Sequence, residues 1–400
     1  MAADHLWKPF DRVHIANPYA MYKRLREEDP VHFSQTGEWI ITRYEDTRNV
    51  LRNSDFLVGN RFEWLKKGIG YFKYKDLDFS NIEAAMKGFI LFLNPPHHTR
   101  IRKFIHQVWN SREVSAIIQH NLDTLLSHQS ESIDLVKDLG KPLPAMTIGK
   151  ILGLPESDYI YLKEQGTVMI KALDLYISFK DIMHVNEAAG NFISYFRKIV
   201  EHKQKNPDQG IISKLIELNA QEKVLDGDEL ISTCILLFIA GEETSVSLMS
   251  TGLYHLISRP HELDDLRSNP GKIATAIEEL IRYDAPVQIV GRIAGEDCEL
   301  NGKTIRKGET LTICLGSANR DPEVFEKADE FIVDREPNKH LGFGGGAHYC
   351  MGDWLARIQT EMMIRSLLER YKSIEMKGVA PKWNNNLAIR CLTELPVKLR

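Results

Sequence analysis

Residues 341–357 read LGFGGGAHYCMGDWLAR, and this stretch places a single cysteine, Cys350, in a glycine-rich loop. The three glycines Gly344 to Gly346 allow backbone conformations that residues with a side chain avoid. Apolar residues recur at helical spacing over residues 353–370, so the sulfur is expected just ahead of a helix N-terminus. Amide N–H groups and the helix dipole stabilise a thiolate there, which suits a metal held by one sulfur.

Two other interpretations of this loop stay open. Most free cysteines are small buried apolar residues, and Cys350 could be one of them. Glycines ahead of a helix can also bind a phosphate group. That kind of site needs a preceding strand and usually a lysine, and neither is clear in this stretch.

The spacing F-x-x-G-x-x-x-C-x-G is met at Phe343, Gly346, Cys350 and Gly352, and His348 lies two residues before the cysteine. This pattern resembles the haem-binding loop of the cytochrome P450 family. The resemblance implies that Cys350 is the thiolate ligand of a haem b iron, with the other residues forming part of the cofactor site.

The bulk composition is that of a globular protein with an ample core: 400 residues, 43% hydrophobic and 26% charged. A formal net charge of -4 argues against nucleic acid as a partner. The five cysteines are scattered without a C-x-x-C pair, which is typical of a reducing compartment. The N-terminus has no signal or anchor pattern, and the longest apolar run, residues 234–240, is too short to span a bilayer. We therefore expect a soluble, cytoplasmic monomer.

Helical spacing dominates the chain. Helices are expected at residues 17–28, 46–52, 82–87, 97–109, 113–127, 144–152, 158–173, 181–205, 210–219, 228–258, 261–267, 273–283 and 353–370. Short strands are expected at residues 31–33 and 39–42, which form a hairpin, and at 287–293, 299–300, 304–305 and 310–314. A second hairpin is expected to join residues 387–392 and 397–399.

These elements predict a mainly α (α+β) fold with small β-sheets, in one domain covering residues 1–400. The resemblance implies the helical prism of the soluble bacterial cytochromes P450, built around haem. Residues 56–92 differ from the rest, because they carry many aromatic side chains with little periodicity; segments of this kind are often functional lids.

The long helix expected at residues 228–258 carries the sequence Ala240-Gly-Glu-Glu-Thr244. A glycine inside a helix costs about 1 kcal/mol against alanine, so Gly241 needs an explanation. Thr244 could merely bond the carbonyl one turn back, and Glu243 could be solvated. The resemblance implies instead that Ala240 and Gly241 lie beside the haem, and that Glu243 and Thr244 relay protons when dioxygen is cleaved.

Glu279 and Arg282 are three residues apart on the helix expected at 273–283, so they share one face. Alone, the pair could be an ordinary surface ion pair of small energetic effect. The resemblance implies a structural set completed by an arginine ahead of the cysteine loop, for which Arg335 is the candidate.

Haem brings two propionates, which need cationic donors. The resemblance implies His98, Arg102, Arg292 and His348 for this role. The basic residues Arg100, Lys103, Arg112 and Arg357 could form a patch that steers an acidic electron donor, or they could be ordinary solvated charges. The chain contains no flavin or iron–sulfur segment, so electrons from NAD(P)H would arrive through a separate ferredoxin or flavodoxin.

The function implied is monooxygenation, in which one atom of O2 enters a lipophilic substrate by hydroxylation or epoxidation and the other leaves as water. The expected substrates are polyketides, terpenoids, steroids or fatty acids. Substrate contacts are expected from residues 56–92 and 168–179, and from Leu236, Ala240, Val287, Ile289, Val290, Leu387, Ala388 and Ile389. The rival hypotheses are a peroxide-driven or C–C-coupling oxidase, a haem-binding sensor without turnover, and a helical protein without cofactor.

Overall fold

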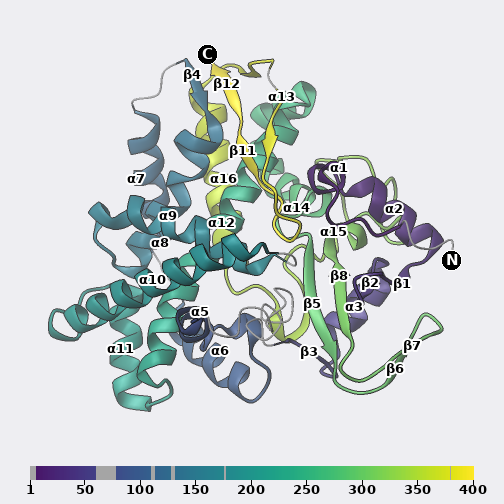
Figure 1. The fold of residues 1–400 in the computed structure, drawn as a ribbon. Coiled ribbons are helices and arrows are strands. Elements are labelled where there is room, and N and C mark those ends of the chain that lie inside the picture. Colours follow the sequence, from purple (N-terminus) through teal and green to yellow (C-terminus); the bar gives the residue numbers. More distant parts are fainter. Residues whose placement is uncertain (1–5, 60–77, 110–112, 128–130, 175–176, 379) are drawn as a thin grey trace. The chain divides into compact units, whose positions relative to one another are not determined.

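The computed structural model describes residues 6–59, 78–109, 113–127, 131–174, 177–378 and 380–400. The chain forms two compact units. The first, here called the sheet unit, comprises Met1–Leu57, His128–Gly140 and Thr244–Arg400, and the second, the helical unit, comprises Val58–Ser127 and Lys141–Glu243. All the described strands belong to the sheet unit (Figure 1).

The helices of the sheet unit are mostly short. They are α1 (Arg12–Ala16), α2 (Tyr19–Glu28), α3 (Tyr44–Arg52), the π-helix η3 (Leu135–Gly140), α13 (Pro260–Ser268), η6 (Pro270–Lys272), α14 (Ile273–Tyr283), α15 (Leu315–Ala318), η7 (Gly346–His348) and α16 (Asp353–Arg370). The longest helix, α12 (Gly227–Ile257), begins in the helical unit and ends in the sheet unit.

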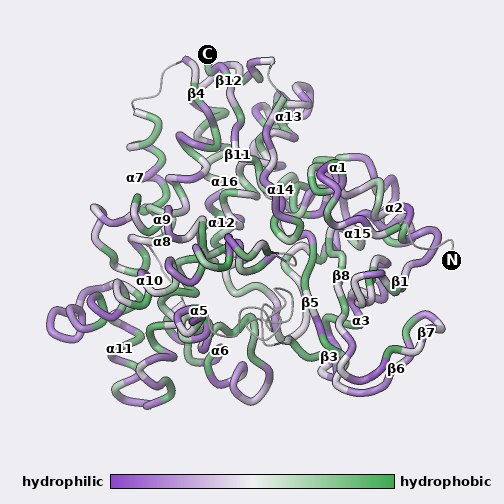
Figure 2. The backbone as a smooth tube through the Cα atoms, in the orientation of Figure 1, coloured by the Kyte–Doolittle hydropathy of each residue, from purple (hydrophilic) through white to green (hydrophobic). Residues whose placement is uncertain are grey.

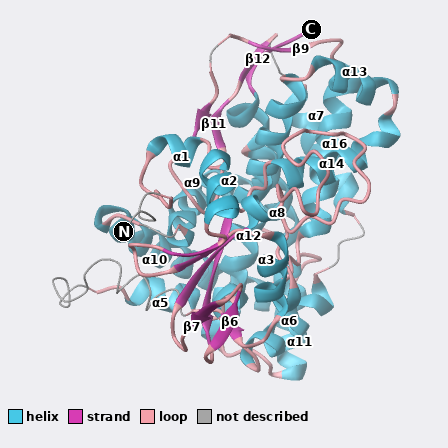
Figure 3. Ribbon diagram, turned by 90° about the vertical axis from the view of Figure 1, so that its right-hand side faces the viewer, coloured by secondary structure: helices cyan, strands magenta, loops and turns pink. Residues whose placement is uncertain are grey.

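The described strands form four small sheets in the sheet unit, and they are magenta in Figure 3. The strands are β1 (Val31–Phe33), β2 (Trp39–Ile41), β3 (Phe56–Leu57), β4 (Ser132–Asp134), β5 (Ile289–Ala294), β6 (Cys298–Leu300), β7 (Lys303–Ile305), β8 (Thr310–Cys314), β9 (Ile374–Met376), β10 (Lys382–Trp383), β11 (Leu392–Glu394) and β12 (Pro396–Leu399). The largest sheet has five strands in the order β1-β2-β8-β5-β3, and β2 pairs with β8 in parallel.

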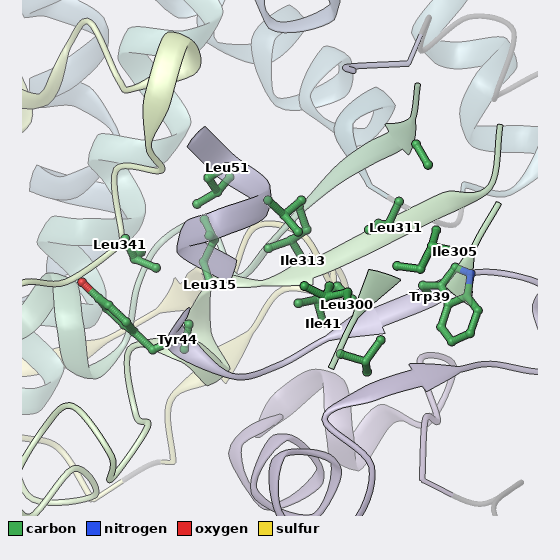
Figure 4. Packing of buried hydrophobic residues seen from close by; sticks show 14 of the residues in the cluster. Trp39, Ile41, Tyr44, Leu51, Leu300, Ile305, Leu311, Ile313, Leu315 and Leu341 are labelled. Atoms are coloured by element: carbon green, nitrogen blue, oxygen red, sulfur yellow. The ribbon is translucent and has the colours of Figure 1, made fainter. Parts of the chain in front are cut away.

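An apolar cluster packs on this five-stranded sheet (Figure 4). Trp39 and Ile41 of β2 pair with Leu311 and Ile313 of β8, so side chains two residues apart on each strand point to the same face. Leu341 joins the same cluster, which ties the start of the cysteine stretch to the sheet.

The helical unit consists of helices packed on one another. They are α5 (Ser80–Met86), η2 (Ile90–Phe92), α6 (His97–Val108), α7 (Val114–Leu126), α8 (Pro142–Leu152), η4 (Glu156–Asp158), α9 (Tyr159–Met169), η5 (Ile170–Leu173), α10 (Phe179–Lys205) and α11 (Ile211–Glu222). Hydrophilic and hydrophobic residues are interspersed along α10 (Figure 2). Its buried residues Val185, Ala189, Phe192 and Phe196 recur at helical spacing, which explains how α10 packs on α5, α9 and α11.

Helix α12 is long and apolar enough to cross a membrane by length and composition alone. However, 78% of its most apolar window is buried inside the structure. A helix that is apolar on every side is expected in the core of a large protein, and we interpret α12 in that way.

The predicted mainly helical class with small sheets is confirmed. The hairpin of β1 and β2 is confirmed too, with Val31 opposite Ile41. The helix expected at residues 82–87 is found as α5, but most of the aromatic segment, residues 60–77, lies outside the described residues.

The predicted C-terminal hairpin is wrong. Strand β11 pairs with β10, whereas β12 pairs with β4 and β9. Residues 387–391 do not form a strand, because the Asn386 side chain accepts the N–H groups of Ala388 and Ile389 at 2.9 and 2.8 Å. An asparagine that bonds the backbone ahead of it in this way favours a turn over a ladder.

Candidate active site

The cysteine loop in the sheet unit is held by its own backbone. The N–H of Cys350 donates to the carbonyl of Phe343 at 3.1 Å, and the N–H of Tyr349 donates to that of Gly346 at 3.2 Å. The loop needs glycine at two places, because Gly344 and Gly346 have φ values of +73° and +65°. Cys350 itself is half-buried.

Gly346 also marks a close approach between two segments. A Cβ atom at this position would lie 2.3 Å from the carbonyl oxygen of Leu51, in α3. No side chain fits in that space. Because Gly346 has no side chain, the cysteine loop can contact the backbone at the end of α3.

Helix α16 begins directly after the loop, with Gly352 as the residue preceding its first turn and Asp353 inside it. The helix expected at residues 353–370 is thus found with the same bounds. The sulfur of Cys350 precedes the helix N-terminus in sequence by three residues, where unbonded amide N–H groups favour a negative charge.

A charged network links α14 to both sides of the loop. Glu278 of α14 accepts from Arg357 at 2.6 and 3.1 Å and lies 3.0 Å from His340 Nε2. Arg357 also bonds Asp353. Burial opposes ionisation of Glu278, yet the bonds from His340 and Arg357 outweigh it and lower the pKa of Glu278 to about 2.

This network bears on the basic patch that the sequence suggested. Arg357 of the sheet unit is paired with two carboxylates, and Arg100 of the helical unit is paired with Glu229. Lys103 is exposed, and Arg112 lies outside the described residues. Because their charges are paired, Arg357 and Arg100 contribute less net positive charge to the protein surface than unpaired arginines would.

Glu279 lies at the centre of a second charged network, with Glu279 and Arg282 buried and Arg335 half-buried. Arg282 donates to its two oxygens at 2.7 and 2.8 Å, and Arg335 reaches them at 3.0 and 3.1 Å. Arg282 also donates to the carbonyls of Asn319 and Ala328. The three residues predicted as a structural set are thus in contact, and neither Glu279 nor Arg282 has exposed surface.

Arg292 is a buried cation of a different kind. It lies on β5, is 6% exposed, and donates to the carbonyl of its neighbour Gly291 at 2.8 Å. No described carboxylate forms an ion pair with it, and burial alone lowers its pKa to about 10. A guanidinium in this position fits an anionic group supplied by a ligand.

The helical unit carries the small-residue stretch of α12. A Cβ on Gly241 would lie 3.0 Å from the side chain of Ile148, so the glycine allows α8 to approach. Glu243 follows on α12, and burial raises its pKa while the nearby Thr167 side chain opposes the rise. Thr244 begins the portion of α12 that belongs to the sheet unit.

Helix α6 carries two of the predicted propionate donors. His98 is buried and Arg102 is half-buried, one turn further along the helix. Burial lowers the pKa of His98, and the charge of Arg102 adds to this effect. The fourth predicted donor, His348, lies half-buried in the 3-10 turn η7 of the cysteine loop.

A small apolar cavity lies in the helical unit, with about 20 Å³ of space for the centre of a water-sized sphere. Every residue of its wall is apolar: Met86, Phe89, Leu91, Met169, Leu173, Leu236, Ile239 and Ala240. Leu236 and Ala240 are named individually as substrate contacts in the sequence analysis, and five further wall residues fall in the two ranges named there: Met86, Phe89 and Leu91 in residues 56–92, and Met169 and Leu173 in residues 168–179. Ile239 was missed, although its spacing from Leu236 and Ala240 places it on the same helix face.

The other named substrate residues belong to the sheet unit, where two segments run together. Val287 forms an isolated bridge with Ile389, and the N–H of Gln288 donates to the carbonyl of Ala388 at 2.8 Å. Leu387, Ala388, Ile389 and Ile289 are buried, and Val290 is half-buried.

Comparison with known protein families matches residues 159–270 and 273–399 to the family described as Cytochrome P450. The chain belongs to the cytochrome P450 family. It is 34% identical to the "Biotin biosynthesis cytochrome P450" of Bacillus subtilis, over 96% of each chain. This P450 is also 32% identical to the "Polyketide biosynthesis cytochrome P450 PksS" of the same species, over 98% of each chain.

Among solved structures, this P450 is similar to P450BioI "in complex with hexadec-9Z-enoic acid ligated Acyl Carrier Protein". The TM-score is 0.87 at 31% identity, and the match covers 97% of this chain and 99% of the other. The predicted P450 fold and the predicted class of oxygen-inserting oxidoreductase are therefore confirmed.

The family implies haem iron and dioxygen, and the residues present fit the group. Cys350 offers a sulfur in a glycine-rich loop ahead of a helix. Arg292 offers a buried cation with no carboxylate partner among the described residues. The sulfur is a suitable ligand for the iron, and the cation is a suitable partner for a propionate.

Proposed function

We propose that this P450 inserts one atom of dioxygen into a lipophilic small molecule, by hydroxylation or epoxidation. The observation that carries the proposal is the cavity in the helical unit, whose wall is entirely apolar. Such a wall offers no hydrogen bond to a polar ligand but favours a hydrocarbon chain or ring. Further apolar contacts with the substrate are proposed for residues of the sheet unit: Val287, Ile289, Val290, Leu387, Ala388 and Ile389.

Within this class, an acyl or polyketide chain is the favoured substrate. The names of two relatives refer to biotin and to polyketide biosynthesis, and P450BioI was solved with a fatty acid on its carrier protein. Methionine, phenylalanine and aliphatic side chains around the cavity suit a flexible chain, since methionine adapts to irregular shapes.

The cofactor would be held by the residues that the sequence predicts for it. Cys350 would be the iron ligand, with Phe343 and Gly352 shaping its loop and Ala240 and Gly241 providing a flat helix surface. Arg292, His98, Arg102 and His348 would bind the propionates. When bound, haem supplies the redox chemistry that activates dioxygen.

Two polar groups on α12 would serve the reaction directly. Glu243 would carry protons from solvent, because its side chain is half-buried and lies near Thr167, whose side chain is exposed. Thr244, the next residue, would hold an ordered water or the reacting oxygen in place. Glu279, Arg282 and Arg335 would act in folding and not in the reaction.

Electrons would come from NAD(P)H through a separate ferredoxin or flavodoxin. The chain would act as one haem domain, as a cytoplasmic monomer. A peroxide-driven oxidase or a C–C-coupling enzyme is the competing function, but the retained pair Glu243 and Thr244 favours dioxygen.

The test begins with the purified protein reduced under carbon monoxide. We expect the long-wavelength absorption band of thiolate-ligated ferrous haem, and its loss in Cys350→Ser. Tetradecanoic acid is then added as a probe, with a ferredoxin, its reductase and NADPH, and oxygenated products are analysed. Products that survive Thr244→Ala with peroxide and no electron donor would favour the peroxide-driven enzyme, whereas absence of the band would refute the proposal.

A further inference from the structure

Two segments of the sheet unit that are proposed to contact the substrate, residues 287–289 and 387–389, are joined through their backbones. They share an isolated β-bridge, and the N–H of Gln288 donates to the carbonyl of Ala388 at 2.8 Å. Gln288 itself is 1% exposed. An extended chain points alternate side chains to opposite sides, so the amide of Gln288 points away from the side that its two apolar neighbours share. A movement of Gln288 therefore displaces both segments.

The amide of Gln288 is held through its nitrogen. Nε2 donates to the carbonyl of Ala285 at 2.7 Å and to the hydroxyl of Tyr19, in α2, at 3.0 Å. Oε1 is buried and has no hydrogen-bond partner among the described residues. A Cβ on Gly316 would lie 2.0 Å from this oxygen, so the glycine leaves room for the amide. The orientation of the amide thus depends on two acceptors, and one of them is the Tyr19 hydroxyl.

The same hydroxyl is bonded to a buried carboxylate, Asp284. Tyr19 donates to Asp284 Oδ1 at 2.6 Å, Arg390 Nε donates to that oxygen at 2.9 Å, and His255 Nε2 lies 2.9 Å from the other oxygen. Burial opposes the ionisation of Asp284, yet the charge of Arg390 and the bond with His255 outweigh it and hold the pKa of Asp284 well below 3.8. A carboxylate only accepts hydrogen bonds, so the Tyr19 hydroxyl donates to it and keeps its lone pairs for Gln288.

Arg390 fixes the second segment from the same carboxylate. It directly follows residues 387–389, is 7% exposed, and its N–H donates to the carbonyl of Pro286 at 2.9 Å. The carboxylate of Asp284 is therefore connected to one segment through Arg390 and to the other through the hydroxyl of Tyr19.

The ring of Tyr19 is held separately from its hydroxyl. The guanidinium of Arg320 lies 3.6 Å from the ring centre, and its Nε donates to the carbonyl of Tyr283 at 2.9 Å. Phenylalanine at position 19 would keep this stacking and lose only the hydroxyl. The connection between the carboxylate and Gln288 can therefore be removed without removing the ring that packs beside it.

We propose that Tyr19 is a positioning residue whose hydroxyl holds Gln288, and with it the two segments, in the arrangement that decides which carbon of the substrate chain is oxygenated. This inference rests on the proposed monooxygenation of an acyl or polyketide chain. Neighbouring carbons of such a chain are chemically alike, so the walls that hold the chain select the carbon that reacts. Without the hydroxyl, the Gln288 amide has one acceptor fewer and loses its single favoured orientation. The two segments then take up more than one arrangement, and the chain reacts at several carbons.

The first measurement is the ratio of the main oxygenated product of tetradecanoic acid to the products at neighbouring carbons. The haem-loaded protein is supplied with a ferredoxin, its reductase and NADPH, and the products are separated by gas chromatography with mass spectrometry. Tyr19→Phe should lower this ratio by roughly fivefold, the effect expected for one lost hydrogen bond. An unchanged ratio would overturn the proposal, whereas a wild-type protein that forms no oxygenated product would overturn the proposed function itself.

Tyr44→Phe is the matched control. It removes a hydroxyl that donates to the carbonyl of Lys339 at 2.6 Å in the same unit, away from the two segments. This variant should lose comparable stability to urea but keep the wild-type product ratio. A ratio that falls equally in Tyr44→Phe and Tyr19→Phe would mean that general loosening is the cause, and would overturn the proposal.

The second measurement tests whether Tyr19 acts through Gln288. Gln288→Met removes the same connection from its other end, so it should give the product ratio of Tyr19→Phe, and the double variant should give no further change. Calorimetry without an electron donor should show a loss of affinity for tetradecanoic acid of roughly two- to fivefold in each single variant. Additive changes in the double variant, or an unchanged affinity in both single variants, would overturn the proposal.

Discussion

The guanidinium of Arg357 lies 4.5 Å from the centre of the Phe343 ring. This contact joins the first turns of α16 to the aromatic residue whose carbonyl accepts the N–H of Cys350. The arginine is itself fixed by Glu278 and Asp353. The loop that carries the sulfur is therefore closed by a cation stacked on a ring, in addition to its backbone bonds.

Arg357→Met should weaken the contacts that hold the cysteine loop. The variant loses the stacked charge and leaves Glu278 with one partner fewer, so the free energy of unfolding should fall by about 1–3 kcal/mol. Urea unfolding followed by circular dichroism measures the change. Arg365→Met is the matched control, because Arg365 is half-buried like Arg357 but pairs with Glu361 one turn away on the same helix, so its loss should change stability less. Equal effects of the two variants would refute the special role of Arg357.

Glu278 should make stability depend on pH in acid. Its pKa is lowered from 4.5 to about 2 in the folded protein, so its contribution is fully present above pH 4.5 and is lost as the pH falls toward 2. Glu278→Gln should therefore be less stable than wild type at neutral pH, and the gap should narrow in this acid range. Urea midpoints at several pH values test this, and a gap that does not change with pH would contradict it.

Gly346→Ala should disturb the loop more than Gly344→Ala does. Both residues have positive φ, which costs a side-chain-bearing residue about 1–2 kcal/mol. Only at Gly346 does the added Cβ also collide with the backbone of Leu51; at Gly344 the nearest atom is 3.9 Å away. The carbon monoxide band of the haem-loaded protein should decay faster in Gly346→Ala. Equal decay in both variants would show that the approach to α3 is unimportant.

Local spacing was enough to predict the cysteine loop, α16 and the shared face of Glu279 and Arg282. It could not predict the partner of Arg357, because Glu278 lies 79 residues away. The local sequence of a helix does not specify which other helix it packs against. The wrong C-terminal hairpin has a similar cause. The apolar run at residues 387–392 has strand composition, but Asn386 bonds the backbone ahead of it, and β12 is paired on both sides by distant strands.

Glu279→Ala should damage folding severely. Removing the carboxylate leaves Arg282 buried without its counter-charge, a change that typically costs about 3–5 kcal/mol. The yield of soluble protein and its thermal midpoint measure the loss. Glu27→Ala removes an exposed pair with Lys23 on α2 and should leave both unchanged. Equal thermal midpoints for Glu279→Ala and Glu27→Ala would refute the structural role of Glu279.

Arg292→Met should raise the stability of the haem-free protein but weaken the binding of haem. In haem-free protein the change removes a buried cation that has no described carboxylate partner and whose pKa is lowered to about 10, so stability should rise by about 1–3 kcal/mol. In haem-loaded protein it removes a propionate donor, so haem affinity should fall roughly tenfold or more. Urea unfolding of the haem-free protein and haem transfer to apomyoglobin measure the two effects, with Arg292→Lys as the variant that keeps the charge. If Arg292→Met destabilises the haem-free protein and holds haem as tightly as wild type, the arginine serves the sheet and not the cofactor.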